Sequence, residues 1–316
     1  MTEIGYTLSS EEHSAPALVR FAQQAEDAGF ASVTISDHYH PWLESQGESA
    51  FVWCTIGGIA ATTKLQVTTG VTCPTVRIHP AVIAQAAATA ATMLEGRFRF
   101  GVGSGEALNE HILGTRWPPA DVRLEMLDEA IEVMRALWSG EVVNHHGRHY
   151  TVENARIYSL PSSPPPVLVS GFGPKATSLA ARIGDGYFNT SPAKELLDQY
   201  VEEGGTGPKL ALVKVCWGED EQQCIKLAHE LWRSSGIPGE ASQEFPMPAH
   251  FEQASQLVTE QMVAESISCG PDVERHASSI RKYIDAGYDE IYITQVGPDQ
   301  QGFFKFFEHD LRPLLV

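Results

Sequence analysis

Short apolar runs and amphipathic stretches alternate along almost the whole chain. Apolar runs of strand length occupy residues 4–8, 31–36, 65–71, 98–103, 167–170, 186–189, 210–216 and 290–294. Stretches with apolar residues at helical spacing occupy residues 14–29, 51–61, 80–94, 123–138, 175–183, 195–203, 219–234, 273–286 and 301–315. Gly29 and Pro80 mark a helix end and a helix start, where glycine and proline are favoured. The pattern therefore predicts eight strands, each followed by a helix.

Eight strand–helix units favour an α/β fold built as a TIM (β/α)8 barrel, because parallel strands joined by helices close at that number. A doubly wound open sheet is the competing architecture, but eight alternations exceed its usual size and no dinucleotide fingerprint opens the chain. We expect one barrel domain over residues 1–316 with two insertions. A histidine-rich hairpin is expected near 142–166, and a proline-interrupted segment with a short helix at 251–257 is expected near 235–270.

The composition limits which kinds of partner the protein can bind and in which cellular compartment we expect it. The net charge of −18 argues against nucleic acid or an anionic membrane, since both attract basic surfaces. The five cysteines are scattered and form no CxxC pair, as expected for free thiols in the cytoplasm. The first residues lack the basic start and apolar core of a signal peptide, and the apolar helix at 81–93 is too short to span a bilayer. A small-molecule substrate is the partner that remains.

Titratable side chains follow two of the predicted strands. His38 comes directly after the strand at 31–36, next to Asp37 and close to Trp42, and Glu106 follows the strand at 98–103. In a barrel the carboxyl ends of the strands form the catalytic face, so we expect His38 and Glu106 to face one pocket. A histidine can take a proton from a substrate hydroxyl, and a nearby carboxylate can exchange one with a cofactor. The structural alternative is that His38 caps a loop and Glu106 caps a helix.

Two glycine-rich turns and a histidine cluster are further candidates. Gly171 and Gly173 precede Pro174 at a helix start, where free N–H groups and the helix dipole suit an anion, with Lys175 adjacent. An ordinary strand–helix turn explains the same residues. The glycines at 101–105 allow close backbone approach but are a weak phosphate signal alone. The histidines at 145–149 lack an acidic or cysteine cluster at metal spacing, so we interpret them as a surface hairpin and predict no metal site.

Several motifs resemble one family along nearly the whole chain. They are SDHYHPW at 36–42, TGVTCPT at 69–75, RIHPA at 77–81, GVGSGEALNE at 101–110, GPKA at 173–176 and GDG at 184–186. Together they resemble the deazaflavin-dependent glucose-6-phosphate dehydrogenase group of the luciferase-like monooxygenase superfamily. The resemblance implies a barrel that binds coenzyme F420, forms a homodimer and transfers a hydride between a substrate carbinol carbon and C5 of the deazaflavin.

The resemblance also implies a role for each site residue. His38 would act on the substrate hydroxyl, Glu106 would assist the deazaflavin ring nitrogen, and Trp42 would steady the charge that develops there. The remaining cofactor-binding positions would be Asp37, Gly70, Val71, Cys73, Gly105, Asn109, Gly171, Gly173, Pro174 and Lys175, with a non-proline cis peptide at Gly70–Val71 and the cofactor phosphate at 173–175.

Two departures from the group concern the pocket. Cys73 stands where the glucose-6-phosphate enzymes have threonine, and no lysine or arginine occurs from Ser234 to Glu274, the region that supplies their phosphate ligands. Lys194 and Arg281 remain as candidate substrate-binding cations, although a phosphate without a cationic fork is poorly held. We therefore expect the substrate to carry an alcohol, sugar or sugar-phosphate hydroxyl, with glucose 6-phosphate poorly supported.

Three alternatives stay open. An FMN-dependent luciferase-like monooxygenase would use the same fold. An F420-dependent reductase of an unsaturated or nitro compound would use the same cofactor. A cofactor-binding protein without turnover would need neither His38 nor Glu106.

Overall fold

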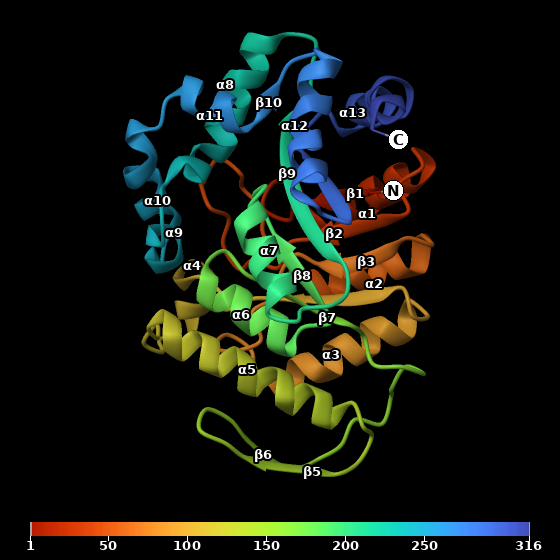
Figure 1. Ribbon diagram of the computed structural model, residues 1–316, viewed down its shortest axis with the longest axis vertical. Coiled ribbons are helices and arrows are strands. Elements are labelled where there is room, and N and C mark those ends of the chain that lie inside the picture. The colour runs from red at the N-terminus through yellow and green to blue at the C-terminus, as the bar shows by residue number, and fades with distance from the viewer. Residues whose placement is uncertain (1, 316) are drawn as a thin grey trace.

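A closed barrel of eight parallel strands forms the centre of the computed structural model, which describes residues 2–315 (Figure 1). The strands are β1 (Glu3–Leu8), β2 (Ser32–Ile35), β3 (Gln66–Thr69), β4 (Phe98–Val102), β7 (Val167–Ser170), β8 (Gly186–Asn189), β9 (Lys209–Cys216) and β11 (Glu290–Gln295). The sheet closes because β9 pairs with both β8 and β11, and β1 pairs with both β11 and β2. The predicted TIM barrel is confirmed, and the open sheet is excluded.

Helices cover the outside of the barrel. They are α1 (Ala15–Asp27), α2 (Val52–Thr62), α3 (Pro80–Met93), α5 (Ala120–Leu137), α6 (Pro174–Ile183), α7 (Lys194–Glu202), α8 (Glu221–Trp232), α12 (Val273–Ala286) and α13 (Gln300–Phe306). The apolar faces of most of them pack on the strands in one large buried cluster, and the apolar face of α8 packs in a second cluster with Cys216 and Val296. Within residues 2–315, no helix combines the length and apolarity that a membrane crossing needs.

The barrel interior is filled by side chains rather than open. Leu168, Phe188, Leu210 and Tyr292 form a buried layer, each from a different strand. At the amino ends of the strands, the Arg99 guanidinium donates to both Glu290 carboxylate oxygens at 2.7 Å. The opposite end, where the strands run into long loops, is the end at which barrel enzymes carry their active sites.

Two segments extend from the barrel, in the regions where insertions were expected. The hairpin β5 (Val143–His146) and β6 (Thr151–Ala155) lies at the bottom of the view in Figure 1. The 233–267 insertion, at the upper left of the same view, holds α9 (Ala241–Glu244), α10 (Pro248–Ala254) and α11 (Glu260–Ser266), followed by the short strand β10 (Ser268–Cys269).

Some local expectations were wrong. The segment after β4 begins with helix α4 (Ala107–Glu110) and a 3-10 turn at 111–113, neither of which was among the predicted helices. The 235–270 region was expected to hold one short helix, but it contains three helices of four to seven residues. Helices this short depend on packing and caps rather than on periodicity, and Thr259 caps α11 by accepting from the Met262 N–H. The helix expected at 301–315 changes after Phe306 into a π turn and then a 3-10 turn.

Candidate active site

The candidate site lies at the mouth of the barrel, meaning the carboxyl ends of the strands and the loops that follow them. The loop after β1 brings Glu11, the loop after β2 brings His38 and Trp42, and the loop after β4 brings Glu106. The predicted convergence of the 36–42 and 101–110 segments is seen directly in the hydrogen bonds between them. The roles of the individual residues stay predictions.

His38 faces a buried carboxylate that the sequence did not single out. The His38 Nε2 atom lies 3.5 Å from Glu11 Oε1, and the Glu11 side chain accepts from the hydroxyls of Ser36 at 2.7 Å and Ser9 at 3.1 Å. The His38 Nδ1 atom lies 3.2 Å from the His40 carbonyl. Because a carbonyl only accepts, Nδ1 carries the proton in the neutral ring and Nε2 can accept one. Glu11 is placed to stabilise the imidazolium that results.

Trp42 connects the His38 loop to the 233–267 insertion. Its ring lies 5.0 Å from the His38 ring and 5.2 Å, edge to face, from Phe251 on α10. Phe251 is buried in a cluster with Leu43 and Leu108. The wall of the mouth on this side is therefore apolar.

Asn109 ties the His38 loop to the Glu106 loop. Its Oδ1 atom accepts from the backbone N–H groups of Tyr39 at 2.8 Å and His40 at 3.2 Å, and its Nδ2 atom donates to Glu106 Oε2 at 3.4 Å. Asn109 is 2% exposed, so these bonds hold the loops after β2 and β4 together from inside the protein. The structure thus gives Asn109 a bracing function that the sequence did not suggest.

Asp37 is also buried and braced by protein groups. It accepts from Arg77 Nη2 and from the Thr72 hydroxyl, both at 2.8 Å. The Arg77 backbone N–H donates to Glu110 at 2.7 Å, and its Nε lies 3.6 Å from the same carboxylate. Burial raises the pKa of Glu110 to about 7, although the Arg77 charge opposes the rise. Arg77 and Glu110 lie in the motifs quoted above, but nothing local in the sequence pairs them.

Cys73 and Gly105 pack against each other beneath Glu106. Gly105 has φ = +79°, and a Cβ there would lie 2.5 Å from the Cys73 Sγ atom. The Cys73 thiol contacts the Thr75 hydroxyl at 3.0 Å, and burial raises the pKa of the thiol well above its usual value. The position therefore requires glycine, and the thiol stays protonated.

The peptide bond between Gly70 and Val71 is cis, as the family resemblance implied. Val71 packs against the interior layer that contains Phe188. A Cβ on Gly101 would lie 1.9 Å from the Thr69 carbonyl oxygen, so β3 and β4 approach too closely there for any other residue.

The glycine turn after β7, where an anion site was predicted, leads into a helix start with open space beside it. Gly173 caps α6 in an extended conformation, and a Cβ there would meet no atom within 4 Å. The first-turn N–H groups of a helix have no acceptor within the helix, so those of Lys175 and Ala176 face this space. The Lys175 ammonium is exposed and pairs with Asp121 at 2.7 Å. Gly171 is enclosed, because its Cβ would lie 2.9 Å from the Thr177 nitrogen.

Neither predicted substrate cation joins the Glu11–His38 pair. Lys194 begins α7 and pairs with Asp198 at 2.7 Å, with 64% of its side chain exposed. Arg281 contacts Glu274 and the Leu314 carbonyl from the second half of α12. That helix leads into the amino end of β11, so Arg281 lies away from the mouth and we expect no substrate contact from it.

Lys214 is the mouth-facing cation that sequence reasoning missed. It lies two and four residues beyond Leu212 and Leu210, which pack in the barrel interior, so strand alternation directs Lys214 inward as well. Burial lowers the pKa of Lys214, and the negative charges of Glu11 and Glu12 oppose that change. The signal in the sequence was a lysine at a strand position whose side chain points into the barrel.

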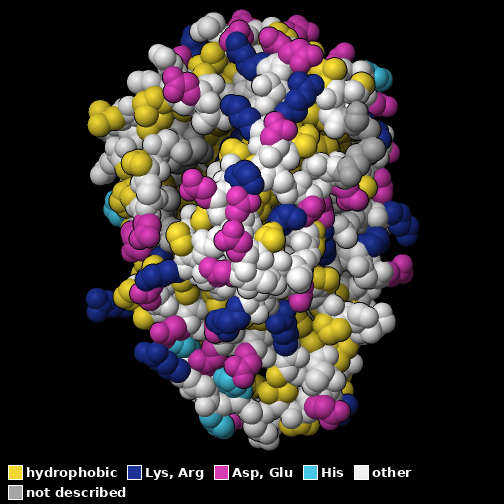
Figure 2. All heavy atoms as spheres, in the orientation of Figure 1, with side chains coloured by type: hydrophobic (Ala, Val, Ile, Leu, Met, Phe, Trp, Pro, Cys, Tyr) yellow, Lys and Arg dark blue, Asp and Glu magenta, His cyan; other side chains and the backbone are white. Residues whose placement is uncertain are grey.

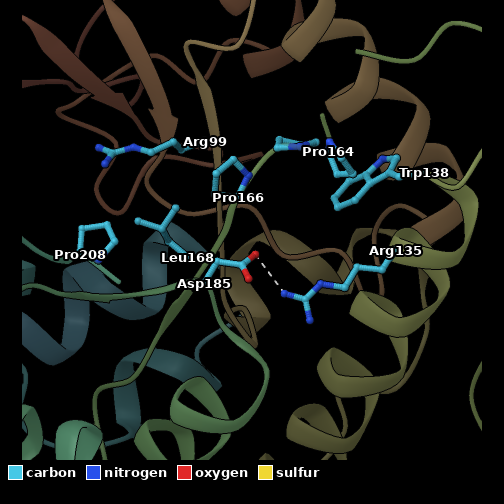
Figure 3. A pocket seen from close by; sticks show the side chains of 9 residues that line it. Arg99, Arg135, Trp138, Pro164, Pro166, Leu168, Asp185 and Pro208 are labelled. Carbon is cyan, nitrogen blue, oxygen red and sulfur yellow. Dashed lines mark hydrogen bonds and ion pairs between the residues drawn. The ribbon is translucent and has the colours of Figure 1, made fainter. Parts of the chain in front are cut away.

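Other clusters lie away from the mouth. A cavity of about 580 Å³, lined by Arg99, Trp138 and Asp185 among others, opens at the amino ends of the strands (Figure 3). Arg135 closes its rim through a 3.0 Å ion pair with Asp185. Among residues 2–315, no group of three or more histidine, cysteine, aspartate or glutamate side chains is arranged to hold a metal ion.

The histidine-rich hairpin docks on α5 through hydrogen bonds. Glu129 accepts from the N–H groups of His149 and Tyr150 and lies 3.1 Å from His145 Nε2. These bonds lower the pKa of Glu129 against the opposing effect of burial. Acidic and basic side chains are interspersed on the face seen in Figure 2, and histidines gather toward its lower end.

Comparison with known proteins gives a consistent set of relatives. A family model described as luciferase-like monooxygenase matches residues 1–290. The chain is 33% identical to an F420-dependent glucose-6-phosphate dehydrogenase of Microbacterium testaceum, over 98% of this chain and 96% of the relative. It is 34% identical to one of Kineococcus radiotolerans, over 99% of this chain and 97% of the relative.

Solved structures agree with this comparison. An F420-dependent secondary alcohol dehydrogenase, in complex with an F420–acetone adduct, superposes with a TM-score of 0.92 at 29% identity, over 100% of this chain and 99% of the other. The coenzyme F420-dependent tetrahydromethanopterin reductase from Methanopyrus kandleri superposes with a TM-score of 0.77 at 19% identity, which shows a common fold.

Proposed function

Since the chain belongs to the luciferase-like monooxygenase family, we propose that it is a coenzyme F420-dependent dehydrogenase that acts on a CH–OH donor. The observation that carries the proposal is the Glu11–His38 pair, held beside Glu106 by the hydrogen bonds of Asn109. A histidine paired with a carboxylate suits removal of a hydroxyl proton. A second carboxylate across the mouth suits proton exchange with a cofactor.

The residues at the mouth fit a deazaflavin. The open space before α6 and the N–H groups of Lys175 and Ala176 would hold the cofactor's phosphate, and Gly173 leaves that space free. The cis bond at Gly70–Val71 and the compact Cys73–Gly105 contact would line the ring side. When bound, coenzyme F420 supplies a two-electron hydride acceptor at C5.

The chain's own residues handle the proton. His38 would accept the substrate hydroxyl proton at Nε2, while its Nδ1–H stays fixed on the His40 carbonyl. Glu11 would hold the imidazolium, because its other oxygen is already anchored by Ser9 and Ser36. Trp42 and Phe251 would exclude water from this side, and Glu106 would exchange a proton with the bound cofactor.

The same residues favour an uncharged secondary alcohol as the substrate. The Trp42 wall is apolar, and no lysine or arginine occurs from Ser234 to Glu274. The charges of Glu11 and Glu12 act on Lys214, and its ammonium lies over the Trp232 ring, so protein groups already engage this cation. Glucose 6-phosphate is the second candidate, because the curated relatives are named for it. Holding its phosphate would fall to Lys194 or to backbone N–H groups.

The test is to load the protein with oxidised coenzyme F420 and add propan-2-ol or glucose 6-phosphate separately while following cofactor absorbance. We expect bleaching with propan-2-ol and none with the sugar phosphate. Bleaching with glucose 6-phosphate alone would overturn the substrate class and retain the cofactor. Bound FMN with oxygen consumption would instead favour the monooxygenase alternative, and F420 binding without turnover on an alcohol panel would favour the non-catalytic one.

A homodimer in the cytoplasm completes the proposal. Phe51, Val82 and Met93 leave apolar side chains 46–56% exposed around a groove of about 300 Å³ on α2 and α3. A second copy of the chain would cover this face, and sedimentation of the protein against a Val82→Asp variant tests it. The five free cysteines agree with a reducing compartment.

A further inference from the structure

A second acidic residue, Glu12, follows Glu11 in the chain and is half-buried. Glu12 Oε1 accepts from the Trp232 indole N–H at 2.8 Å, and Glu12 Oε2 accepts from the Gly297 backbone N–H at 2.8 Å. The two donors come from α8 and from the loop after β11, so two distant elements hold this carboxyl group. Burial, together with the charge of Glu11, raises the pKa of Glu12 to about 7, although the hydrogen bonds from Gly297 and Trp232 oppose the rise.

Lys214 completes this group from β9. Its Nζ atom lies 4.3 Å from the centre of the Trp232 ring, the same ring whose N–H donates to Glu12. The charges of both Glu11 and Glu12 act on the ammonium. The Trp232 indole therefore contacts the Glu12 carboxyl group through its N–H and the Lys214 ammonium through its ring face.

The remaining titratable groups around the two carboxylates contribute little charge near neutral pH. Burial lowers the pKa of His13 to about 4, against the charge of Glu11, so its ring is neutral. Burial also raises the pKa of Tyr6 well above its usual value, and its hydroxyl donates to Gln300. The charge behind the Glu11–His38 pair is thus set by Glu12 and Lys214.

We infer that Glu12 and Lys214 are positioning residues for the reaction, which set the charge behind Glu11 and with it the pH range in which His38 works as a proton acceptor. The inference rests on the proposed function. A positive charge near a titrating cluster favours its deprotonated form, and a negative charge favours its protonated form. The two residues must therefore act in opposite directions.

Shifts of the pH profile in opposite directions in two variants distinguish a positioning role from a purely structural one. Replacing Lys214 by methionine removes the positive charge. The acid limb of the pH profile of kcat/KM for alcohol oxidation, meaning its fall at low pH, should then move to higher pH by about one unit. The Glu12→Gln variant removes the acid and should move the same limb to lower pH. The Lys214→Arg variant keeps the charge and should return the limb to within about 0.3 unit of wild type. A packing defect would lower kcat without moving the limb.

A second readout needs neither cofactor nor substrate. Carbon-13 NMR of the glutamate carboxyl groups, with the Glu12 signal assigned by its loss in Glu12→Gln, should show titration near pH 7 in wild type. The midpoint should rise in Lys214→Met and stay near wild type in Lys214→Arg. Melting temperatures show which variants remain folded.

Opposite movement of the acid limb in Lys214→Met and Glu12→Gln, with the raised Glu12 midpoint, supports the inference. An unmoved limb, movement in one direction, or a Glu12 midpoint near 4.5 overturns it. Wild-type protein that binds F420 but oxidises no alcohol refutes the proposed function instead, and the NMR result then still decides whether Lys214 and Glu12 are coupled.

Discussion

Replacing Arg77 by methionine removes the cation that lies between two buried carboxylates, Asp37 and Glu110. Asp37 loses an ion pair at 2.8 Å, and Glu110 loses a contact at 3.6 Å but keeps the backbone N–H of residue 77. Both carboxylates are almost fully buried, and removing one partner of such a pair costs about 3–5 kcal/mol. We therefore expect the free energy of unfolding to fall by about 4 kcal/mol at pH 8.

The loss of unfolding free energy in Arg77→Met should depend on pH in a definite direction. Glu110 already has a raised pKa of about 7, and loss of the cation raises it further. An acid whose pKa is raised in the folded state stabilises the protein below its unfolded pKa, and this contribution is lost as pH rises through the folded value. The deficit of Arg77→Met should thus grow between pH 6 and pH 8.

Urea unfolding at pH 6 and pH 8 measures both effects, with Arg135→Met as the matched control. Arg135 forms an ion pair of similar length with Asp185 at 3.0 Å, but both side chains are more than 40% exposed, and such pairs contribute about 0–1 kcal/mol. The double variant Arg77→Met/Asp37→Asn should recover part of the loss, because one unpaired charge is gone. Equal costs for Arg77→Met and Arg135→Met, or a deficit independent of pH, would refute the buried-pair reasoning.

Three further changes test the site and its supports. His38→Ala should lower kcat by about 10²–10⁴-fold while F420 affinity, measured by fluorescence, changes less than about threefold; retained turnover would contradict its role as proton acceptor. Gly105→Ala should cost about 2 kcal/mol more than Gly96→Ala in chemical unfolding, since both glycines have positive φ but only Gly105 would place a Cβ against the Cys73 sulfur. Glu129→Ala should expose the β5–β6 hairpin to limited proteolysis and lower stability by about 1–3 kcal/mol, because buried N–H groups lose their acceptor; an unchanged cleavage pattern would show that other contacts hold the hairpin.

The strands and their order could be predicted because each barrel strand is a short apolar run between clear helix signals. The same pattern places the 36–42 and 101–110 segments at one edge of the barrel, since carboxyl ends of parallel strands share it, and the hydrogen bonds of Asn109 join these two segments. The local periodicity of the chain and the closing of eight strand–helix units into a barrel are sufficient for these predictions.

The charge partners could not be predicted, because they depend on contacts between distant segments. Glu11 and Glu12 look like polar residues before a helix, and Lys214 lies about 200 residues away in a strand that reads as apolar. Arg281 is the opposite case, a residue that the sequence offered as a substrate-binding cation but that lies on a helix running away from the mouth. The short helices of the 233–267 insertion were missed because packing, rather than periodicity, stabilises them.

The most direct test of the central claim follows the hydrogen atom. The protein is mixed with oxidised coenzyme F420 and propan-2-ol carrying deuterium at carbon 2, and the reduced cofactor is examined by NMR and mass spectrometry. Direct hydride transfer at the barrel mouth predicts one deuterium at C5 of the deazaflavin and a primary isotope effect on the rate. The isotope effect should persist in His38→Asn if that variant retains measurable turnover. Reduced cofactor without deuterium, or no reduction by any secondary alcohol, would contradict the account.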